Sequence, residues 1–445
     1  MLAKPKFTNQ IGLFNAIESL IDQQHPLFKL ANVIEWGAFD ESFKKHYSEK
    51  MGKPAKPVRL MVSLLILKHL RNLSDENLVD QWAENIYFQY FSGEQFFQPK
   101  IPCVPTELVA FRQRIGEEGM ELILKESIRI NKCNNQDKDG AVVSVDTTVQ
   151  EKNISYPTDD KLYKKIIKKC WIIADKENID LRQSYTQTVK KLSVQQRFKH
   201  SKYGFKAAGK ASKKIKIIAG RLVREIARKL LLDRLGMYLP QLKLFQRVLS
   251  QKREDTDKIY SLHEPDVKCY SKGKEHKKYE FGSKVSILID QYSGVIKGAI
   301  NFTQTLHDSK TIPEVLEQYE RLNGIQAKEV YVDRGYKGIK QYKDSTIFVP
   351  VPDKSISKNQ RRKHSRRSAV EPTIGHLKQD YRLCRNFLKG IAGDNINVIL
   401  SAAAWNFRRR IILWLTEAIR RWLLTLKLIM GISRNFYALI LKPTF

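Results

Sequence analysis

The segment that most constrains the fold is residues 141–149, whose alternating pattern predicts a β-strand with an acid in its middle. Val143 and Val145 fall on one face of this strand, and Asp146 and Thr148 fall on the other. Aspartate is unfavourable inside a strand. Asp146 therefore lies either at a surface edge of a sheet or where chemistry requires a carboxylate, and the strand alone leaves both interpretations open.

The order of the later elements indicates the fold class. The predicted strands and helices after the first strand are two strands, a helix and two further strands, at 285–289, 295–300, 311–323, 330–332 and 347–349. A helix carrying Glu371 follows them. This is the order of the ribonuclease-H-like fold, a mixed sheet whose first strand is central and adjacent to the fourth. We therefore expect an α+β or α/β catalytic domain in which Asp146, Asp333 and Glu371 lie together.

Glu371 is the only carboxylate between Asp353 and Asp380, in a segment rich in Lys and Arg. The spacing Ser368-x-x-Glu371 fits a capping box, a common start of a helix. The alternative role is that of a metal ligand, and the two roles do not exclude each other. Asp308, which precedes a predicted helix, is a further candidate acid. We interpret it as a helix cap or a support of the site, and we prefer Glu371 as the third ligand.

The cations near the two later acids are candidates for contacts with nucleic acid, and they are Arg334, Arg367, Lys378, Arg382 and Arg385. The segment that starts at Val370 is predicted to be one amphipathic helix. Its apolar stripe consists of Val370, Ile374, Leu377, Tyr381, Cys384 and Leu388. On such a helix, the last three of the cations share an edge with Glu371. That edge suits a carboxylate at the reacting centre followed by contacts to a phosphate chain.

The net charge indicates a polyanionic partner. Lys and Arg number 79 against 47 Asp and Glu, which gives +32. Residues 1–140 are neutral, with 18 basic and 18 acidic residues, whereas residues 161–252 hold 25 basic against five acidic residues. At this density a nucleic-acid surface is favoured over a merely solvated face. The contacts expected from this basic segment are those of Lys213, Lys214, Lys216 and Arg221.

Composition divides the chain into four parts. We predict a helical N-terminal domain for DNA-end recognition or dimerisation, a catalytic domain in two pieces, a basic helical insertion and C-terminal helices, at residues 1–136, 141–160 with 253–390, 161–252 and 391–445. The helix at 57–70 and the helix that starts at Ser74 form either a DNA-reading pair or a plain helical hairpin. The neutral charge favours the hairpin. Charged residues interrupt the apolar stretch at 411–430, which predicts an amphipathic helix and not a membrane span.

Three motifs together resemble a known family. They are VSVDTT at 143–148, YVDRGYKG at 331–338 and RRSAVEPTIGHLK at 366–378. The chain is similar to the DDE transposases of bacterial insertion sequences, most of all to those of the IS-five type, which are related to the IS-four type. Arg367, Glu371 and Lys378 fit the last three places of a related signature, in which His364 stands where Tyr is usual. The insertion after the first strand also differs from relatives that insert before the final helix.

The resemblance implies an enzyme that cuts phosphodiester bonds at the ends of a DNA element and joins the 3′-hydroxyl ends to target DNA. Asp146, Asp333 and Glu371 are the expected catalytic residues and metal ligands. Carboxylates suit Mg²⁺, for which Mn²⁺ can substitute, and phosphodiester cleavage suits a pair of ions. Partners would be double-stranded DNA, as terminal inverted repeats and target, and further copies in a homodimer or higher oligomer.

Two other functions remain compatible with the same residues. A different ribonuclease-H-like endonuclease would use the three acids without a strand-transfer step. A non-catalytic DNA-binding derivative would have no need of all three acids, which argues against it. For each of these functions we expect a cytoplasmic, nucleoid-associated bacterial protein without a membrane segment.

Overall fold

The computed structural model describes residues 16–48, 54–132, 141–252, 254–271, 278–350 and 357–430, with side chains as far as Leu426. The chain forms two compact units. The larger unit contains residues 1–150, 284–302 and 306–445, and the smaller contains residues 151–283 and 303–305. The predicted linker at 134–140 and most of the last eighteen residues lie outside the described part of the chain.

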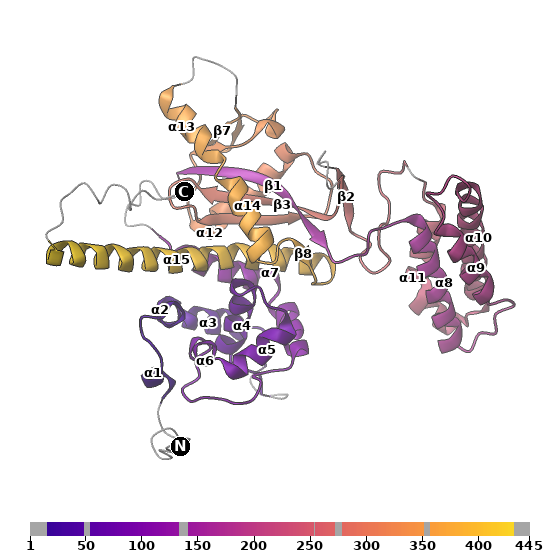
Figure 1. Ribbon diagram of the computed structural model, residues 1–445, viewed down its shortest axis with the longest axis horizontal. Helices are drawn as coiled ribbons and strands as arrows, with labels where there is room; N and C mark the ends of the chain where they lie inside the picture. Colours follow the sequence, from indigo (N-terminus) through magenta and orange to yellow (C-terminus); the bar gives the residue numbers. More distant parts are fainter. Residues whose placement is uncertain are drawn as a thin grey trace, which may run out of the picture. The chain divides into compact units, whose positions relative to one another are not determined.

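A mixed sheet forms the centre of the larger unit, and its first strand in the chain is a central one (Figure 1). β1 (Val142–Lys152) lies between β3 (Tyr279–Asp290) and β5 (Glu329–Tyr331). β1 and β5 are parallel, with Ser144 opposite Tyr331. The predicted fold class and the predicted adjacency of the first and fourth strands are therefore confirmed.

The remaining strands extend the sheet on both sides of this pair. β7 (Ser345–Phe348) is parallel to β5, and β6 (Gln341–Tyr342) is antiparallel to β7. β4 (Ile296–Phe302) is antiparallel to β3, and β8 (Arg385–Asn386) pairs with β1. Because β1 has neighbours on both sides, the interpretation of Asp146 as a residue at a surface edge is wrong.

Two hydrophobic cores cover the two faces of the sheet, as the alternation along β3 shows. Leu288 packs with Val145, Val330 and the helix α12 (Ile312–Asn323). Ile287 and its neighbours on the opposite face belong to a larger core with α15 (Gly390–Met430), which runs below the sheet in Figure 1. The strands are therefore held from both faces, which fixes the position of the side chains at their ends.

The N-terminal helices share the larger of these cores. They are α1 (Ile17–Leu20), α2 (Pro26–Val33), α3 (Trp36–Lys44), α4 (Val58–Leu70), α5 (Asp75–Glu84), α6 (Ile86–Phe91) and α7 (Pro105–Arg129). α4 is buried all round, and α15 packs against both α4 and α7. A helix without a free face packs as part of a core, so the packing of α4 with α5 supports the plain hairpin.

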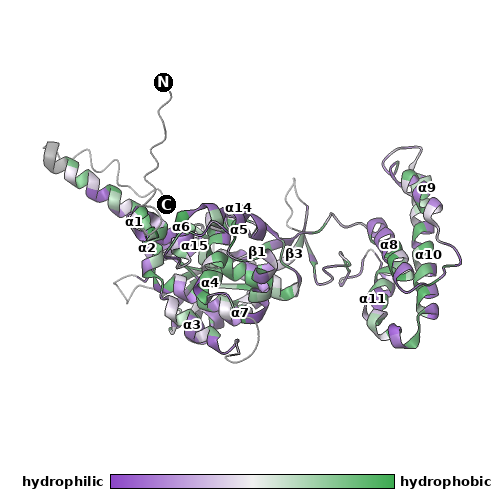
Figure 2. Cartoon of the chain, turned by 90° about the horizontal axis from the view of Figure 1, so that it is seen from below, coloured by the Kyte–Doolittle hydropathy of each residue, from purple (hydrophilic) through white to green (hydrophobic). Residues whose placement is uncertain are grey.

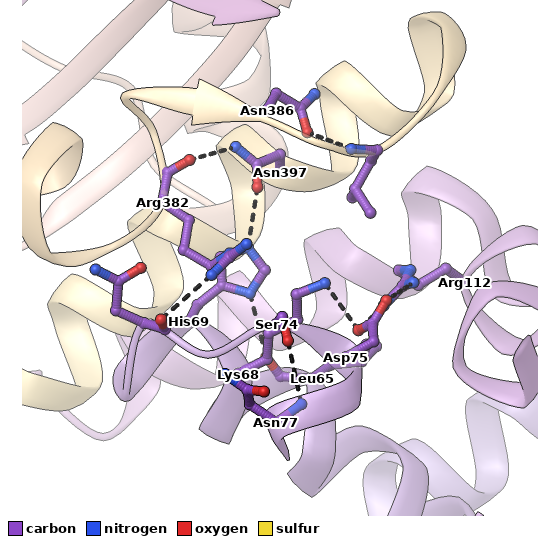
Figure 3. Close-up of polar contacts among 12 residues, drawn as sticks. Leu65, Lys68, His69, Ser74, Asp75, Asn77, Arg112, Arg382, Asn386 and Asn397 are labelled. Carbon is purple, nitrogen blue, oxygen red and sulfur yellow. Dashed lines mark hydrogen bonds and ion pairs between the residues drawn. The ribbon is translucent and has the colours of Figure 1, made fainter. Parts of the chain in front are cut away.

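A buried ion cluster joins three of these helices (Figure 3). The Asp75 carboxylate at the start of α5 accepts a bond of 2.8 Å from Lys68 Nζ of α4 and one of 2.6 Å from Arg112 Nη2 of α7. Burial opposes ionisation of Asp75, but the bonds and charges of Arg112 and Lys68 outweigh it and lower its pKa to about 2. Asp75 therefore stays charged and pairs with two buried cations.

A second set of polar contacts links α4 to the central strand β1 through Asn397 of α15 (Figure 3). Asn397 Oδ1 lies 3.2 Å from Nε2 of His69. Its Nδ2 donates to Gln150 Oε1 of β1 at 2.7 Å and to the Arg382 carbonyl oxygen at 3.0 Å. Burial, with the charge of Lys68, lowers the pKa of His69 to about 3, so the imidazole is neutral. One amide thus connects α4, β1 and the segment after α14 (Val370–Asp380).

The end of α14 differs from the prediction of one long helix. α14 stops at Asp380, Arg382 has a left-handed backbone with φ of 67°, and Arg385 lies in β8. The Arg382 guanidinium donates to the Asn72 carbonyl oxygen at 3.2 Å, a tertiary contact that turns the chain away from the helix axis. Only Lys378 of the three predicted cations therefore shares α14 with Glu371, and Cys384 is exposed instead of buried.

The smaller unit consists mainly of helices with a core of their own. They are α8 (Asp159–Lys176), α9 (Thr186–Gln196), α10 (Phe205–Lys229) and α11 (Leu232–Ser250), followed by the strand β2 (Lys268–Ser271). Figure 2 shows hydrophobic and hydrophilic residues alternating along α10. Ile215 and Leu222 lie in the core, while Lys213 and Arg221 are exposed. Among the described residues there is no helix long and apolar enough to cross a membrane.

The ion cluster yields a prediction about stability. Replacing Asp75 by Ala leaves the buried Lys68 and Arg112 without their anion, so we expect a loss of about 3–5 kcal/mol in the free energy of unfolding. Denaturant unfolding followed by circular dichroism measures it. The exposed neighbour Glu76 is the matched control, and Glu76→Ala should change stability by less than about 0.5 kcal/mol. Equal effects of the two variants would contradict the role of the cluster.

Candidate active site

Two acids lie just beyond the paired residues of the two central strands, Asp146 within β1 and Asp333 after β5. Asp146 follows the paired residue Ser144 by two positions on β1, and Asp333 follows Tyr331 by two positions after β5. Asp146 Oδ1 accepts from the backbone N–H of Thr147 at 2.7 Å. Asp333 Oδ1 accepts from the backbone N–H of Gly335 at 2.9 Å, which starts the short helix η2 (Arg334–Tyr336). The parallel register therefore sets the two carboxylates side by side, as the sequence predicts.

Arg367 links Glu371 to Asp146, because its guanidinium contacts both carboxylates. Arg367 is the last residue of α13 (Lys358–Arg367), and its guanidinium lies 3.1 Å from Glu371 Oε1 and 3.7 Å from Asp146 Oδ2. The Arg367 side chain is 16% exposed, whereas that of Glu371 is 62% exposed. A partly buried guanidinium thus lies between a carboxylate of the sheet and a carboxylate of α14.

The predicted capping box does not form. The residue before α14 is Ala369, which makes no side-chain capping bond. The Ser368 hydroxyl instead donates to the Ser365 carbonyl oxygen at 2.7 Å, because Ser368 still belongs to the end of α13. The carboxylate of Glu371 is therefore engaged by Arg367 and not by the backbone of a cap.

The pKa of Asp146 reports the crowding of negative charge. Burial, together with the charges of Asp333 and Glu371, raises this pKa to about 6 against the lowering effects of the Thr147 N–H and Arg367. Burial and the charges of Asp146, Asp308 and Asp333 also raise the pKa of the buried Tyr336 well above its usual value. These carboxylates are close enough to destabilise one another when they are ionised.

Asp308 is part of this acidic group and is held by two donors. Its Oδ1 accepts from Thr147 Oγ1 at 2.7 Å and from Lys284 Nζ at 2.8 Å. The residue lies in the short helix η1 (Asp308–Thr311), and the residue before α12 is Thr311, without a side-chain capping bond. The interpretation of Asp308 as a cap of α12 is therefore wrong. Its bond to Thr147, next to Asp146, makes it a support of the site.

Gly335 allows Asp308 and Asp333 to approach each other. A Cβ atom at this position would lie 3.0 Å from Asp333 Oδ1 and 3.1 Å from Asp308 Oδ2. Both distances are shorter than ordinary van der Waals contact. A side chain at Gly335 would therefore push one of the carboxylates away. The close approach of the two acids thus explains the glycine in YVDRGYKG.

The side chains predicted to contact nucleic acid differ in their exposure and in their surroundings. Arg334 and Arg385 are exposed, Lys378 is partly exposed on α14, and Arg367 lies among the acids. Arg382 packs over the Phe387 ring at 5.7 Å in addition to its bond with Asn72. In the smaller unit, Lys213, Lys214 and Arg221 are exposed and Lys216 is partly exposed. The structure thus brings Arg367 to the acids and gives Arg382 a structural role.

Sequence reasoning missed Thr147 and Lys284 as partners of Asp308. Thr147 is adjacent to Asp146 in the strand, which is a signal of proximity but not of bonding. Lys284 comes from β3 and carries no signal in the sequence, because its contact depends on the pairing of β3 with β1.

The donor chemistry of the acids fits a divalent cation. Asp146, Asp333 and Glu371 supply hard oxygen ligands, and their mutual repulsion favours a positive charge between them. Arg367, whose Nη1 is buried without a hydrogen-bond partner, already places one positive group there. Within the described residues, however, no three Asp, Glu, His or Cys side chains are grouped closely enough to hold a metal ion.

A ribonuclease-H-like sheet with one acid on its central strand and another just after the neighbouring strand is typical of enzymes that act on phosphodiesters. Two family models match the chain and agree with this class: a transposase domain (DUF772) over residues 15–114 and a transposase DDE domain over residues 254–407. The second match contains Asp333 and Glu371. Neither match covers residues 115–253.

A curated relative is the uncharacterised protein ORF8 in the nfe locus of Rhizobium meliloti, with 40% identity over 189 residues, 42% of this chain and 91% of the relative. No solved structure matches the chain. The chain belongs to the insertion-sequence DDE transposases.

The raised pKa of Asp146 predicts that the ionised carboxylate lowers the free energy of unfolding of the protein. The folded-state pKa of about 6 exceeds the usual value of 3.8. Ionisation is therefore unfavourable in the folded protein, and the cost is absent below about pH 4 and complete above about pH 6. In metal-free buffer, Asp146→Asn should raise the free energy of unfolding by about 2 kcal/mol at pH 7.5 and leave it nearly unchanged at pH 4.

Urea unfolding at the two pH values measures this difference. The control is Asp160→Asn, since Asp160 lies in the first turn of α8, in the smaller unit. A variant Asp146→Asn that is less stable than the wild type at pH 7.5 would show that the carboxylate is held by favourable contacts and not by strain.

Proposed function

We propose that the protein cuts DNA at the ends of an insertion sequence and joins the freed 3′-hydroxyl groups to target DNA. The observation that carries this proposal is the electrostatic coupling of Asp146 to both Asp333 and Glu371 in a chain that matches a transposase DDE domain. The three acids come from three elements: a central strand, the segment after its neighbour and a helix.

In this proposal, Asp146, Asp333 and Glu371 hold two Mg²⁺ ions, for which Mn²⁺ can substitute. Bound divalent ions supply activation of a water or 3′-hydroxyl and stabilisation of the leaving oxygen. The contribution of the chain is to fix the oxygen ligands before DNA arrives. The Thr147 N–H orients Asp146, and the Gly335 N–H orients Asp333.

Arg367 and Asp308 act on the acids as positioning residues. Arg367 compensates the charges of Asp146 and Glu371 in the free protein, and it also has the chemistry to bind a DNA phosphate. Asp308 holds the Thr147 hydroxyl, with Lys284 balancing its charge. Together they keep the β1 strand end in place while the ionic environment changes on DNA binding.

The exposed cations next to the acids would bind the DNA backbone. Arg334 follows Asp333 directly, and Lys378 lies on the same helix as Glu371. Arg385 is exposed in β8, which pairs with β1. These side chains contact phosphates on either side of the reacting bond in our proposal, and the double-stranded ends and the target are bound by a homodimer or higher oligomer.

The first functional prediction concerns the acids. Asp146→Asn, Asp333→Asn and Glu371→Gln should each lower cleavage by at least about 100-fold, above the 10–100-fold typical of losing a residue that only orients a metal ligand. Binding of the same DNA should stay within about twofold, because no phosphate contact is removed. The measurement is cleavage and joining of labelled element ends with Mg²⁺, beside a binding assay.

Asp380→Asn is the matched control for these variants. Asp380 is an exposed acid of the same helix as Glu371, and it pairs with His376 at 2.8 Å instead of with the site. This variant should cleave like the wild type. Normal cleavage by Glu371→Gln would remove Glu371 from the ligand set. Cut ends that never join to a target would favour another ribonuclease-H-like nuclease.

The second prediction concerns the basic helices of the smaller unit. Neutralising Lys213, Lys214, Lys216 and Arg221 together should weaken duplex binding regardless of sequence. Each lost phosphate contact lowers the log–log salt slope by about 0.9, so the dependence of affinity on salt should become shallower. Titrations at several salt concentrations measure the slope. An unchanged slope would show that these cations only keep the helix face solvated.

A further inference from the structure

A turn between α9 and α10 exposes three aromatic rings. Phe198 is 56% exposed, Tyr203 is 91% exposed and Phe205 is 63% exposed. Aromatic side chains provide large apolar surfaces that proteins normally bury. Three such rings within eight residues form a patch of the kind that marks a binding surface. We call residues 197–206 the aromatic turn.

The backbone of the aromatic turn is fixed by its own contacts. Ser201 Oγ accepts from the Gly204 N–H at 2.9 Å, and the Ser201 N–H donates to the Phe198 carbonyl oxygen at 3.1 Å. A Cβ atom on Gly204 would lie 2.6 Å from that carbonyl oxygen. Only glycine therefore allows the turn to close so tightly. The rings of Phe198 and Phe205 are carried by two segments that touch, which gathers the exposed faces at one end of α10.

The surroundings of the rings are strongly basic. Between Asp180 and Glu225 the chain has 13 Lys and Arg and no acid. Arg197, Lys199, Lys202 and Lys206 lie in the aromatic turn and are exposed. None of these four forms an ion pair with any described residue. The surface therefore suits a partner that offers both negative charge and flat apolar faces.

Unpaired nucleotides have this combination. Phosphate contacts alone require only Lys and Arg, so a purely duplex-binding surface gains nothing from three exposed rings. In a duplex the base faces are stacked and hidden, whereas an unpaired base offers a face to an aromatic side chain. The cations beside the rings would hold the backbone of the same strand.

We propose that the aromatic turn binds unpaired nucleotides, with Tyr203 and Phe205 stacking on bases and the neighbouring cations contacting phosphates. The inference rests on the proposed function, because that function supplies DNA as the partner. It goes beyond that function in assigning to the smaller unit a preference for single-stranded over duplex DNA.

The test compares the binding of two fluorescent oligonucleotides to the full chain, a single strand of mixed sequence and a blunt-ended duplex of the same sequence. The double variant Tyr203→Ala with Phe205→Ala should bind the single strand at least about tenfold more weakly, since each stacked ring contributes several-fold or more. Its affinity for the duplex should change by less than about twofold.

Salt titration distinguishes a loss of charge from a loss of stacking. A lost phosphate contact changes the salt dependence of the affinity, whereas a lost stacking contact does not. Because a stacked base releases no counterion, the salt slope for the single strand should be unchanged in the double variant. The matched control is Leu232→Ala, which removes a side chain that is 90% exposed in the same unit. It should leave both affinities unchanged. Tyr203→Phe with intact Phe205 should restore the single-strand affinity, and circular dichroism verifies the helices of each variant.

Other results would overturn the inference. An unchanged single-strand affinity, or an equal loss for both oligonucleotides, would remove base stacking from this surface. A double variant that binds both DNAs normally but no longer self-associates in sedimentation would assign the rings to a contact between copies. Failure of the proposed function is distinguishable, since then the wild type would not cleave element ends at all.

Discussion

The parallel pairing of β1 with β5 is the constraint on which the site depends. With Ser144 opposite Tyr331, the residues two positions further along the two strands are Asp146 and Asp333. A shift of one residue in this register would turn one acid to the opposite face of the sheet. The apolar residues of both strands pack against α12, so the register that buries Val145 and Val330 is also the one that aligns the acids.

Buried amides connect this sheet to the helices around it. Asn406 of α15 donates to the Ile296 carbonyl oxygen and accepts from the Ile296 N–H, both at 2.8 Å, and its Nδ2 also contacts Ser127 of α7. Asn397 makes a similar link among α4, β1 and Arg382. A buried amide with its bonds satisfied specifies one arrangement, because any other leaves polar groups without partners. The N-terminal helices are thereby fixed to the catalytic sheet.

The pattern of apolar residues was sufficient to predict β1, β3, β4, β5 and β7 and the adjacency of β1 and β5, but not the short strands β2, β6 and β8. It did not predict the end of α14. The apolar spacing continues to Tyr381 and beyond, but the bond from Arg382 to Asn72 turns the chain, and that partner lies 310 residues away. The bonds of Asp308 to Lys284 and Thr147 could not be predicted from the sequence either, because they also join residues that are far apart in the chain. Local spacing reports helix faces, whereas these contacts depend on how separate segments are packed.

The separate core of the smaller unit has a consequence for how such a chain changes in evolution. The buried residues of α8 to α11 pack among themselves and with Ile259 and Leu262, and they contribute nothing to the two cores that hold the sheet. Substitutions inside these helices therefore leave the apolar packing of the sheet unchanged. The helices between β1 and β2 thus form a module whose surface can change while the packing that holds the sheet is kept.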